Sequence, residues 1–131
     1  MTDGRPLDDL VRQRSHEART ALDELVSALD ACIAELRDAH RHAGELADRY
    51  EAGQSWAAIA SDETPPLVVE RISAAMSTLS TSGSRWRRAH ALVLHAEGMS
   101  INRIAALFRV TRQRVSVLVN GQARAVDRVE S

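Results

Sequence analysis

The stretch from Leu7 to Ala52 constrains the fold most strongly, because it contains no proline and only one glycine, Gly44. Its apolar residues recur at alternating steps of three and four, the heptad spacing that aligns them along one side of an α-helix. These residues are Val11, Ala18, Leu22, Leu25, Leu29, Cys32, Leu36, Ala39, Ala43, Leu46 and Tyr50. A continuous helix of this length extends about 70 Å, and its apolar side needs a partner.

Two partners for this helix fit the pattern. In the first, a second copy of the chain pairs with it, as a homodimer or a higher assembly, in parallel or antiparallel orientation. In the second, the helix folds back on its own chain, with a break near His40–Gly44. Val26 and Ile33 widen the apolar stripe beyond a strict two-stranded seam, which also permits a four-chain assembly. The residues expected at the dimerisation seam are Leu22, Leu25, Leu29, Cys32, Leu36 and Leu46.

The rest of the 131-residue chain is also expected to be helical. Aromatic residues make up only 3% of it, so the core must consist of Leu, Ala, Val and Ile, a composition that favours helices. The predicted fold class is all-α. It comprises a long helix over 1–52, a short helical connector over 53–83, a three-helix unit over 84–122 and a tail over 123–131.

Turn signals divide the connector into short helices. Gly53 is expected to close the long helix, and Ser55 to cap the next one. Thr64 is a predicted N-cap, with Pro65 at the first position of its helix. The run of serine, threonine and glycine at 80–84 predicts a flexible break and a domain boundary.

The charge of the chain changes sign at this boundary. Residues 1–83 contain 8 arginines against 15 aspartates and glutamates, whereas residues 84–131 contain 9 arginines against 3 acidic residues. The net balance is therefore −7 in the first part and +6 in the second. A basic C-terminal part indicates an anionic partner for that part of the chain only.

Three short helices with tight connections are predicted over residues 85–121, the arrangement of a helix-turn-helix. Ser100 and Thr111 are the expected N-caps of the second and third helices, and Ala105 supplies the small residue that two crossing helices need. The third helix is expected to end at Asn120–Gly121. The predicted inward-facing residues are Ala89, Leu92, Val93 and Ala96 in the first helix, Ile104, Ala105 and Leu107 in the second, and Val115, Leu118 and Val119 in the third.

Residues 98–116, GMSINRIAALFRVTRQRVS, resemble the helix-turn-helix of the promoter-reading domain of bacterial sigma factors. Their Val-Thr-Arg-x-Arg-Val core is similar to that of many small actinobacterial helix-turn-helix regulators. All 17 basic residues are arginine, which indicates GC-rich coding. No other sigma-factor domain is recognisable, so the resemblance implies a regulator rather than a sigma factor. Phe108 and Arg109 replace the Leu-Gly that is usual in the turn, and arginine is unfavourable where the backbone turns left-handed.

Together with the long helix, the resemblance implies a homodimer that binds double-stranded DNA sequence-specifically and regulates transcription. The base-reading positions of the family fall on Arg112, Gln113, Ser116 and Val117. Arginine can bind guanine, glutamine can bind adenine, and valine can contact a thymine methyl group. Ser116 stands where arginine is frequent in the family. The residues expected at DNA phosphates are Arg85, Arg87, Arg88, Arg103, Arg109, Thr111 and Arg114.

The sequence GQSWAAIA at 53–60 repeats the pattern of GMSINRIA at 98–105. This repeat raises the hypothesis of a second, degenerate helix-turn-helix over residues 43–80. Acidic residues in this stretch would repel phosphate, so a structural role is expected there, with residual DNA contact as the alternative. These residues are Asp62, Glu63 and Glu70.

Several other functions are disfavoured by the sequence. The single cysteine, Cys32, excludes an intramolecular disulfide and a cysteine zinc motif, and the histidine spacings disfavour a metal site. No phosphate loop or nucleophile motif is present, so neither catalysis nor a cofactor is expected. No apolar run has the length of a membrane span and no signal-peptide pattern opens the sequence. The expected location is therefore the cytoplasm, in association with the nucleoid.

A second functional hypothesis comes from a different class of protein. In it, the chain is an adaptor that binds a toxin, a sigma factor or RNA polymerase through its acidic N-terminal helix, and the helix-turn-helix only tethers it to DNA. Both hypotheses predict that DNA binding weakens as salt rises, because phosphate contacts are screened. Only the regulator is expected to prefer one DNA sequence.

Overall fold

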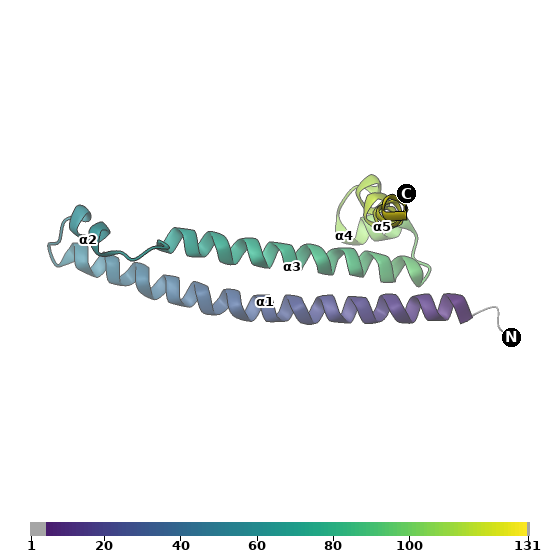
Figure 1. Cartoon of the computed structure of the whole chain (residues 1–131), viewed down its shortest axis with the longest axis horizontal. Helices are drawn as coiled ribbons and strands as arrows, with labels where there is room; N and C mark the ends of the chain where they lie inside the picture. Colours follow the sequence, from purple (N-terminus) through teal and green to yellow (C-terminus); the bar gives the residue numbers. More distant parts are fainter. Residues whose placement is uncertain (1–4, 131) are drawn as a thin grey trace. The chain divides into compact units, whose positions relative to one another are not determined.

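The computed structural model describes residues 5–130, and the side chains of residues 7–121. Its helices are α1 (Arg5–Glu51), α2 (Trp56–Asp62), α3 (Val68–Ala96), α4 (Ile101–Phe108) and α5 (Arg112–Glu130) (Figure 1). No strand occurs among residues 5–130. The predicted all-α fold, with its long N-terminal helix and C-terminal helix-turn-helix, is confirmed.

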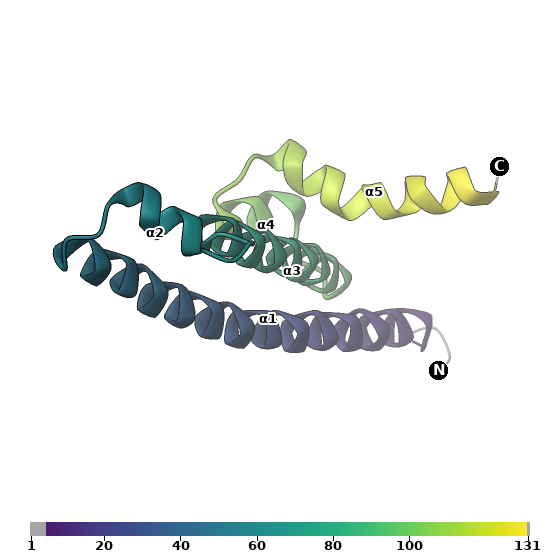
Figure 2. The same cartoon turned by 60° about the vertical axis from the view of Figure 1, so that its left-hand side comes forward.

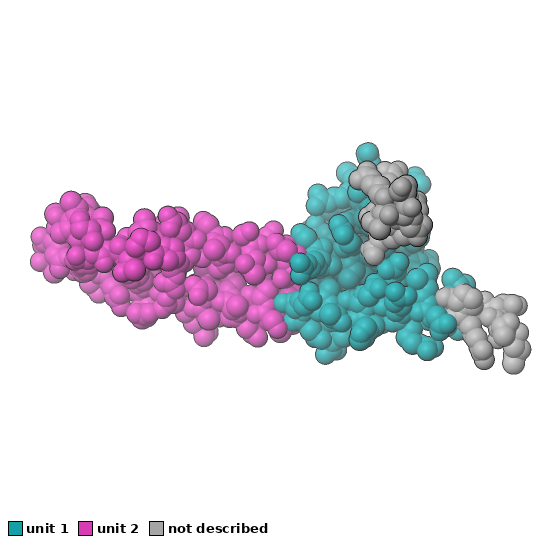
Figure 3. All heavy atoms as spheres, in the orientation of Figure 1, with its two compact units in different colours: residues 1–24, 83–131 teal, residues 25–82 magenta. Residues whose placement is uncertain are grey.

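The helices form two compact units. One unit comprises residues 25–82, and the other comprises residues 83–131 together with residues 1–24 (Figure 3). α1 and α3 each contribute one segment to each unit. The division between Ser82 and Gly83 therefore falls inside α3 rather than in a loop.

In the unit of residues 25–82, the first part of α3 lies alongside α1 (Figures 1 and 2). Arg71 of α3 forms ion pairs with Glu35, at 3.1 Å, and with Asp38 of α1. Cys32 and Ala39 are buried on the same side of α1. The chain therefore covers one face of α1 by itself, but the break expected near His40–Gly44 is absent, because α1 continues without interruption to Glu51.

The end of α1 follows the predicted turn chemistry. Gly53 has φ +99°, a conformation that glycine adopts without a steric penalty, and its N–H donates to the Tyr50 carbonyl at 3.0 Å. Ser55 is the N-cap of α2, since its Oγ accepts from the Ala58 N–H at 3.1 Å. Both predictions are confirmed, and they fix the short connection between α1 and α2.

The start of α3 differs from the prediction. Thr64 and Pro65 were expected to begin the helix, but α3 begins at Val68. Pro66 explains the difference, because a proline disfavours helical backbone at the residue before it, here Pro65. The Glu70 carboxylate accepts instead from the N–H of Leu67, at 3.1 Å, and so stabilises the first turn of α3.

The flexible break predicted at 80–84 is wrong, because α3 passes through these residues as a continuous helix. The hydroxyl groups of Thr78 and Thr81 donate to the carbonyls of Ala74 and Ser77 one turn earlier, each at 3.1 Å. These bonds satisfy side chains that would otherwise compete with the helical backbone. Serine and threonine are therefore compatible with helix here.

The core of the C-terminal part contains residues from three helices. Ala91 of α3, Ile104 and Ala105 of α4, and Val115 of α5 are buried together. The predicted place of Ala105 at the helix crossing is consistent with this cluster. Partly buried residues surround it, namely Leu94, Met99, Ile101, Phe108, Val110, Leu118 and Val119.

One inward-facing prediction for this core, Leu107, is corrected. Leu107 is 58% exposed, and Phe108 packs against the core in its place. Ile101, Ile104 and Phe108 follow the helical spacing of three and four that aligns side chains on one face, whereas Leu107 falls outside it. In α3, Leu92 and Val93 are buried but lie outside this cluster, and Ala91 faces it.

α5 does not end at Asn120–Gly121, as predicted, but continues to Glu130. Gly121 does not adopt the positive φ of a helix-closing glycine. The Asn120 side-chain amide donates to the Ser116 Oγ at 3.1 Å, one turn earlier, instead of capping the helix. α5 is therefore longer than a minimal recognition helix.

Candidate nucleic-acid interface

The turn between α4 and α5 contains Arg109, which has φ 57° and ψ 45° in the left-handed region. Its N–H donates to the Ala106 carbonyl at 3.3 Å, and the Val110 N–H donates to the Ala105 carbonyl at 3.1 Å. These bonds close α4 tightly, as a glycine would allow without strain. Thr111 then caps α5, because its Oγ1 accepts from the Arg114 N–H at 3.1 Å. Hydrogen bonds at the end of α4 and at the start of α5 therefore fix the direction of α5.

The outer face of α5 carries the residues predicted to read bases. Val115 is fully buried, so the opposite side of the first two turns faces away from the core. Arg112 and Gln113 are exposed there, and Ser116 is half-buried. Val117 is 61% exposed, a large apolar side chain with no cover from this domain. Such an exposed valine suits contact with another molecule.

Asn120 belongs to the same face and was missed by the sequence reasoning. It was assigned to the end of the third helix, but it is helical and exposed, one turn beyond Ser116. The available signal was its spacing of four from Ser116 and three from Val117, which places all three side chains on one side of a helix. An asparagine in this position has both the donor and the acceptor that adenine recognition requires.

Exposed arginines occur on all three helices of this domain. None of them forms an ion pair with another side chain of residues 7–121, and Glu97 is the one acidic residue of residues 84–121. Unpaired guanidinium groups are favourable contacts for phosphate. These arginines are Arg87 and Arg88 on α3, Arg103 on α4, Arg109 in the turn, and Arg112 and Arg114 on α5.

Arg85 differs from these arginines, although it was predicted as a phosphate contact as well. Its guanidinium lies 3.8 Å from the carboxylate of Glu24 on α1. Both residues belong to the same compact unit. This ion pair is exposed and therefore weak, but it places a negative charge beside Arg85 that a phosphate would have to displace.

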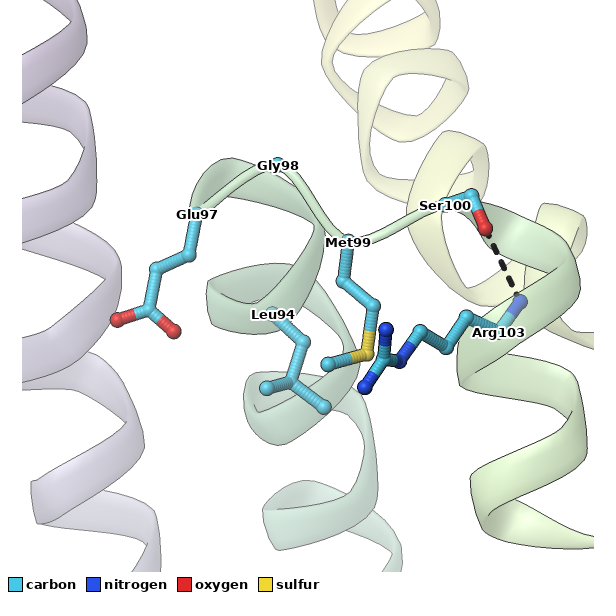
Figure 4. Close-up of a pocket in the computed structure, with 6 residues that line it drawn as sticks. All are labelled: Leu94, Glu97, Gly98, Met99, Ser100 and Arg103. Carbon is cyan, nitrogen blue, oxygen red and sulfur yellow. Dashed lines mark hydrogen bonds between the residues drawn. The ribbon is translucent and has the colours of Figure 1, made fainter.

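The connection between α3 and α4 forms an open hollow of about 430 Å³ (Figure 4). Gly98 turns the chain with φ +99°, and the Ser100 Oγ accepts from the Arg103 N–H at 3.1 Å as the N-cap of α4. In Figure 4 the Arg103 side chain extends toward Met99, whereas Glu97 points away from it. The guanidinium of Arg103 is therefore not paired with the carboxylate of Glu97. The predicted cap at Ser100 is confirmed.

An aromatic stack joins α3 to the end of α4. The Trp86 and His90 rings are stacked with centroids 4.6 Å apart, and the His90 and Phe108 centroids are 5.2 Å apart. Burial lowers the pKa of His90, since desolvation disfavours the charged imidazolium. The neutral ring therefore supports Phe108, the residue directly before the Arg109 turn.

The repeat found in the sequence also appears in the local backbone. Gly53 and Gly98 share φ +99°, and Ser55 and Ser100 are N-caps of the same geometry, each accepting from the N–H three residues later. Ile59, like Ile104 at the corresponding position, is buried. The helix-closing turn and the following cap are therefore the same in both copies.

The two copies diverge after this point. Glu63 ends α2 in extended backbone, with φ −74° and ψ 129°, whereas Arg109 ends α4 in the left-handed region. Acidic residues of the first copy are paired with α1, through His42 and Glu63 at 3.1 Å and through Arg49 and Asp62 at 2.6 Å. The first copy thus lacks both the tight turn and the free cations of the second.

A buried three-helix core, a tight left-handed turn and a capped helix with an outward polar face define a helix-turn-helix domain. In agreement with this, residues 82–127 match the protein family described as homeodomain-like domain. Searches of curated proteins and of solved structures gave no match. The family match supports a DNA-binding helix-turn-helix protein, and the similarity to sigma factors stays a prediction.

Two further findings concern other classes of site. Among the described residues, no three His, Cys, Asp or Glu side chains are placed to hold a metal ion. None of the helices over the described residues combines the length and the apolar character that crossing a membrane requires.

Proposed function

We propose that the protein is a sequence-specific, double-stranded DNA-binding transcription regulator that acts as a homodimer in the cytoplasm, in association with the nucleoid. The observation that carries this proposal is the set of exposed arginines on α3, α4, α5 and the turn before α5 that form no ion pair within residues 7–121. In an ordinary solvated surface, charges of both signs are interspersed. Here one sign prevails across three helices of a domain similar to the homeodomain-like family.

In the proposed complex, the first turns of α5 enter the major groove. Arg112 binds guanine and Gln113 binds adenine, each through two hydrogen bonds, and Val117 contacts a thymine methyl group. Ser116 and Asn120 complete the face, their side chains being linked at 3.1 Å. The remaining arginines and Thr111 bind phosphates, which supply affinity and register without sequence information.

Two copies of this domain would read two half-sites. When recognition helices lie side by side in a dimer, half-site centres are about 34 Å apart, which corresponds to one turn of DNA. The residues proposed at the dimer seam differ from one another in exposure. Leu29 and Leu36 are exposed, Cys32 is buried, and the others are half-buried, namely Leu22, Leu25 and Leu46.

The test is selection of genomic DNA fragments by the purified protein at about 150 mM salt. We expect enrichment of one near-palindromic sequence. The variant Arg112→Ala should lose about 1–3 kcal/mol on that sequence and relax the preference at one base step. Arg12→Ala, on an exposed position of α1, is the matched control and should bind like the wild type. Equal loss of Arg112→Ala on every sequence would contradict its base-reading role.

The adaptor hypothesis remains a second candidate because of one exposed feature outside the DNA-binding domain. Tyr50 and Trp56 are stacked with ring centroids 4.3 Å apart, and Trp56 is 60% exposed. Exposed aromatic pairs are common in protein–protein interfaces. If the selected fragments share no sequence while binding still weakens steeply with salt, the result favours the adaptor hypothesis, in which the helix-turn-helix only tethers the protein to DNA.

A further inference from the structure

α1 carries a second apolar stripe that stays exposed in this chain, although Tyr50 at its end also stacks on Trp56. Its positions follow the heptad steps of three and four from residue 26 to residue 50, and every one of them is exposed. None is an aspartate, glutamate or arginine, although α1 is rich in all three. The stripe consists of Val26, Leu29, Ile33, Leu36, His40, Ala43, Ala47 and Tyr50.

This stripe is distinct from the face that packs within the chain. The intrachain face contains the buried residues Cys32 and Ala39, and its neighbour Glu35 is paired with Arg71 of α3. At 3.6 residues per turn, the centres of the two faces are separated by about 90–100° around the helix. The packing of α3 on α1 within residues 25–82 therefore cannot bury the stripe.

The area of the stripe is in the range of the apolar surface patches that often mark an interaction site. Its four largest aliphatic side chains, on successive heptad positions, are between 39% and 50% exposed. A strip of this length and one helix width covers on the order of 400 Å², comparable with the largest apolar patch of a typical monomer. Two such strips facing one another would bury about 800 Å², which is expected for a weak, concentration-dependent association.

The residue types select the partner and its direction. Val26 and Ile33 are β-branched and occupy the a positions of the heptad, whereas Leu29 and Leu36 occupy the d positions. Among parallel coiled coils, this combination favours two strands, in which each residue meets its own copy. The flanking e positions hold Asp30 and Arg37, which would face apolar g positions of the partner and so bring no like charges together.

We infer that a second copy of this chain pairs in parallel with α1 through the Val26–Tyr50 stripe. The inference deepens the proposed function and rests on it for its biological meaning, because it names the dimer surface of the regulator. The proposed contact surface differs from the seam expected from the sequence, because it contains Leu29 and Leu36 but excludes Cys32. The result is a dimer of helix pairs with the two α1 helices at its centre.

The first measurement is the molar mass of the full chain by sedimentation equilibrium between about 1 and 200 μM, the range expected for an interface of this area. The wild type should change from monomer to dimer within this range. Ile33→Lys should remain monomeric, while Ser27→Lys, on an exposed position outside the stripe, should behave like the wild type. Circular dichroism confirms that each variant keeps its helix content. A wild type that is monomeric throughout, or a dimeric Ile33→Lys variant, overturns the inference.

The second measurement tests the direction of pairing by disulfide formation in a Cys32→Ala background. Ala43→Cys lies on a d position, so two parallel copies bring its thiols together and oxidation should yield a covalent dimer. Ala34→Cys is exposed but lies off the stripe, and it should stay monomeric. Failure of Ala43→Cys to crosslink at concentrations where the wild type is dimeric overturns the parallel arrangement.

Failure of this inference is distinguishable from failure of the proposed function. Ile33→Lys and the wild type are compared on the same selected DNA sequence. If the dimer surface is correct, Ile33→Lys should bind a full palindrome at least tenfold more weakly and a half-site equally well. If the wild type is monomeric but still selects one sequence, the proposed dimer surface is wrong, while the proposal that α5 reads bases still holds.

Discussion

At the scale of single residues, Arg109 is the non-glycine side chain that the described backbone holds at positive φ. Left-handed backbone costs an L-residue about 1–2 kcal/mol. Glycine avoids this cost, but only part of it appears as added stability, because glycine also makes the unfolded chain more flexible. Arg109→Gly should therefore raise the free energy of unfolding by about 0.5–1 kcal/mol in chemical denaturation. The same variant should bind DNA more weakly on every sequence, because it removes a cation beside α5.

Arg109→Ala separates these two effects of the arginine. It removes the charge but keeps a Cβ in the left-handed turn, so it should lose DNA affinity without gaining stability. If both variants were equally stable, the turn would not be strained. An arginine kept at a position that favours glycine is consistent with a functional contact rather than with stability alone.

His90 gives a prediction on pH. Burial between Trp86 and Phe108 lowers its pKa in the folded state below the ordinary value of 6.5. The unfolded chain then binds a proton more readily, so stability is fully present above the unfolded pKa and decreases as the pH falls from about 6.5 through the folded pKa. Thermal unfolding of the wild type should therefore show a lower Tm at pH 5 than at pH 7.

His90→Phe keeps an aromatic ring in the stack and removes the titrating group. The difference in Tm between pH 5 and pH 7 should be smaller for this variant than for the wild type. An unchanged pH dependence would show that other groups are responsible. The stack matters for function because Phe108 directly precedes the turn that orients α5.

At the scale of helices, local chemistry predicted three N-caps and the end of α1 at Gly53, but not the start of α3. Ser55, Ser100 and Thr111 cap helices as predicted, because each side-chain oxygen satisfies a backbone N–H three residues later. Helix continuity was predicted poorly. The run at 80–84 and the pair Asn120–Gly121 both read as breaks, but packing along α3 and hydrogen bonds within each helix outweigh weak local propensity.

The candidate site shows the same limits of sequence reasoning. The resemblance to helix-turn-helix domains implied Arg112, Gln113, Ser116 and Val117, and helical spacing is compatible with their lying away from the buried Val115. Asn120 has the matching helical spacing but was missed, because the third helix was expected to end there. The ion pair of Arg85 with Glu24 joins residues far apart in the sequence, and no local pattern announces it.

Gly83 tests whether α3 is one helix. Its backbone is helical and a Cβ at this position would meet nothing within 4 Å. Gly83→Ala should therefore raise the free energy of unfolding by about 0.5–1 kcal/mol, because alanine has the higher helix propensity. Gly98→Ala is the contrasting variant, since Gly98 has φ +99° and alanine there is strained. Loss of stability in Gly83→Ala would indicate that the chain needs a flexible joint at this position.

At the scale of the whole molecule, the separation of charge between the two parts of the chain should control how DNA binding depends on salt. The acidic residues before residue 84 repel phosphate, whereas the arginines after it release counterions when they bind phosphate. Each phosphate contact contributes about −0.9 to the slope of log K against log salt concentration. The DNA affinity of a dimer that uses several arginines per copy should therefore fall very steeply as the salt concentration rises.

Arg103 and Arg85 provide the matched pair for this prediction. Arg103 is free of ion pairs within residues 7–121, whereas Arg85 lies beside Glu24. In a dimer, Arg103→Ala should reduce the magnitude of the slope by about 2, one contact from each copy, with the preferred sequence unchanged. Arg85→Ala should change the slope less, because its carboxylate partner already offsets its charge. Fluorescence titrations between 50 and 300 mM salt, roughly the range over which phosphate contacts are screened, measure both slopes. Equal effects of the two variants would mean that DNA displaces Glu24 and recruits Arg85 as a full phosphate contact.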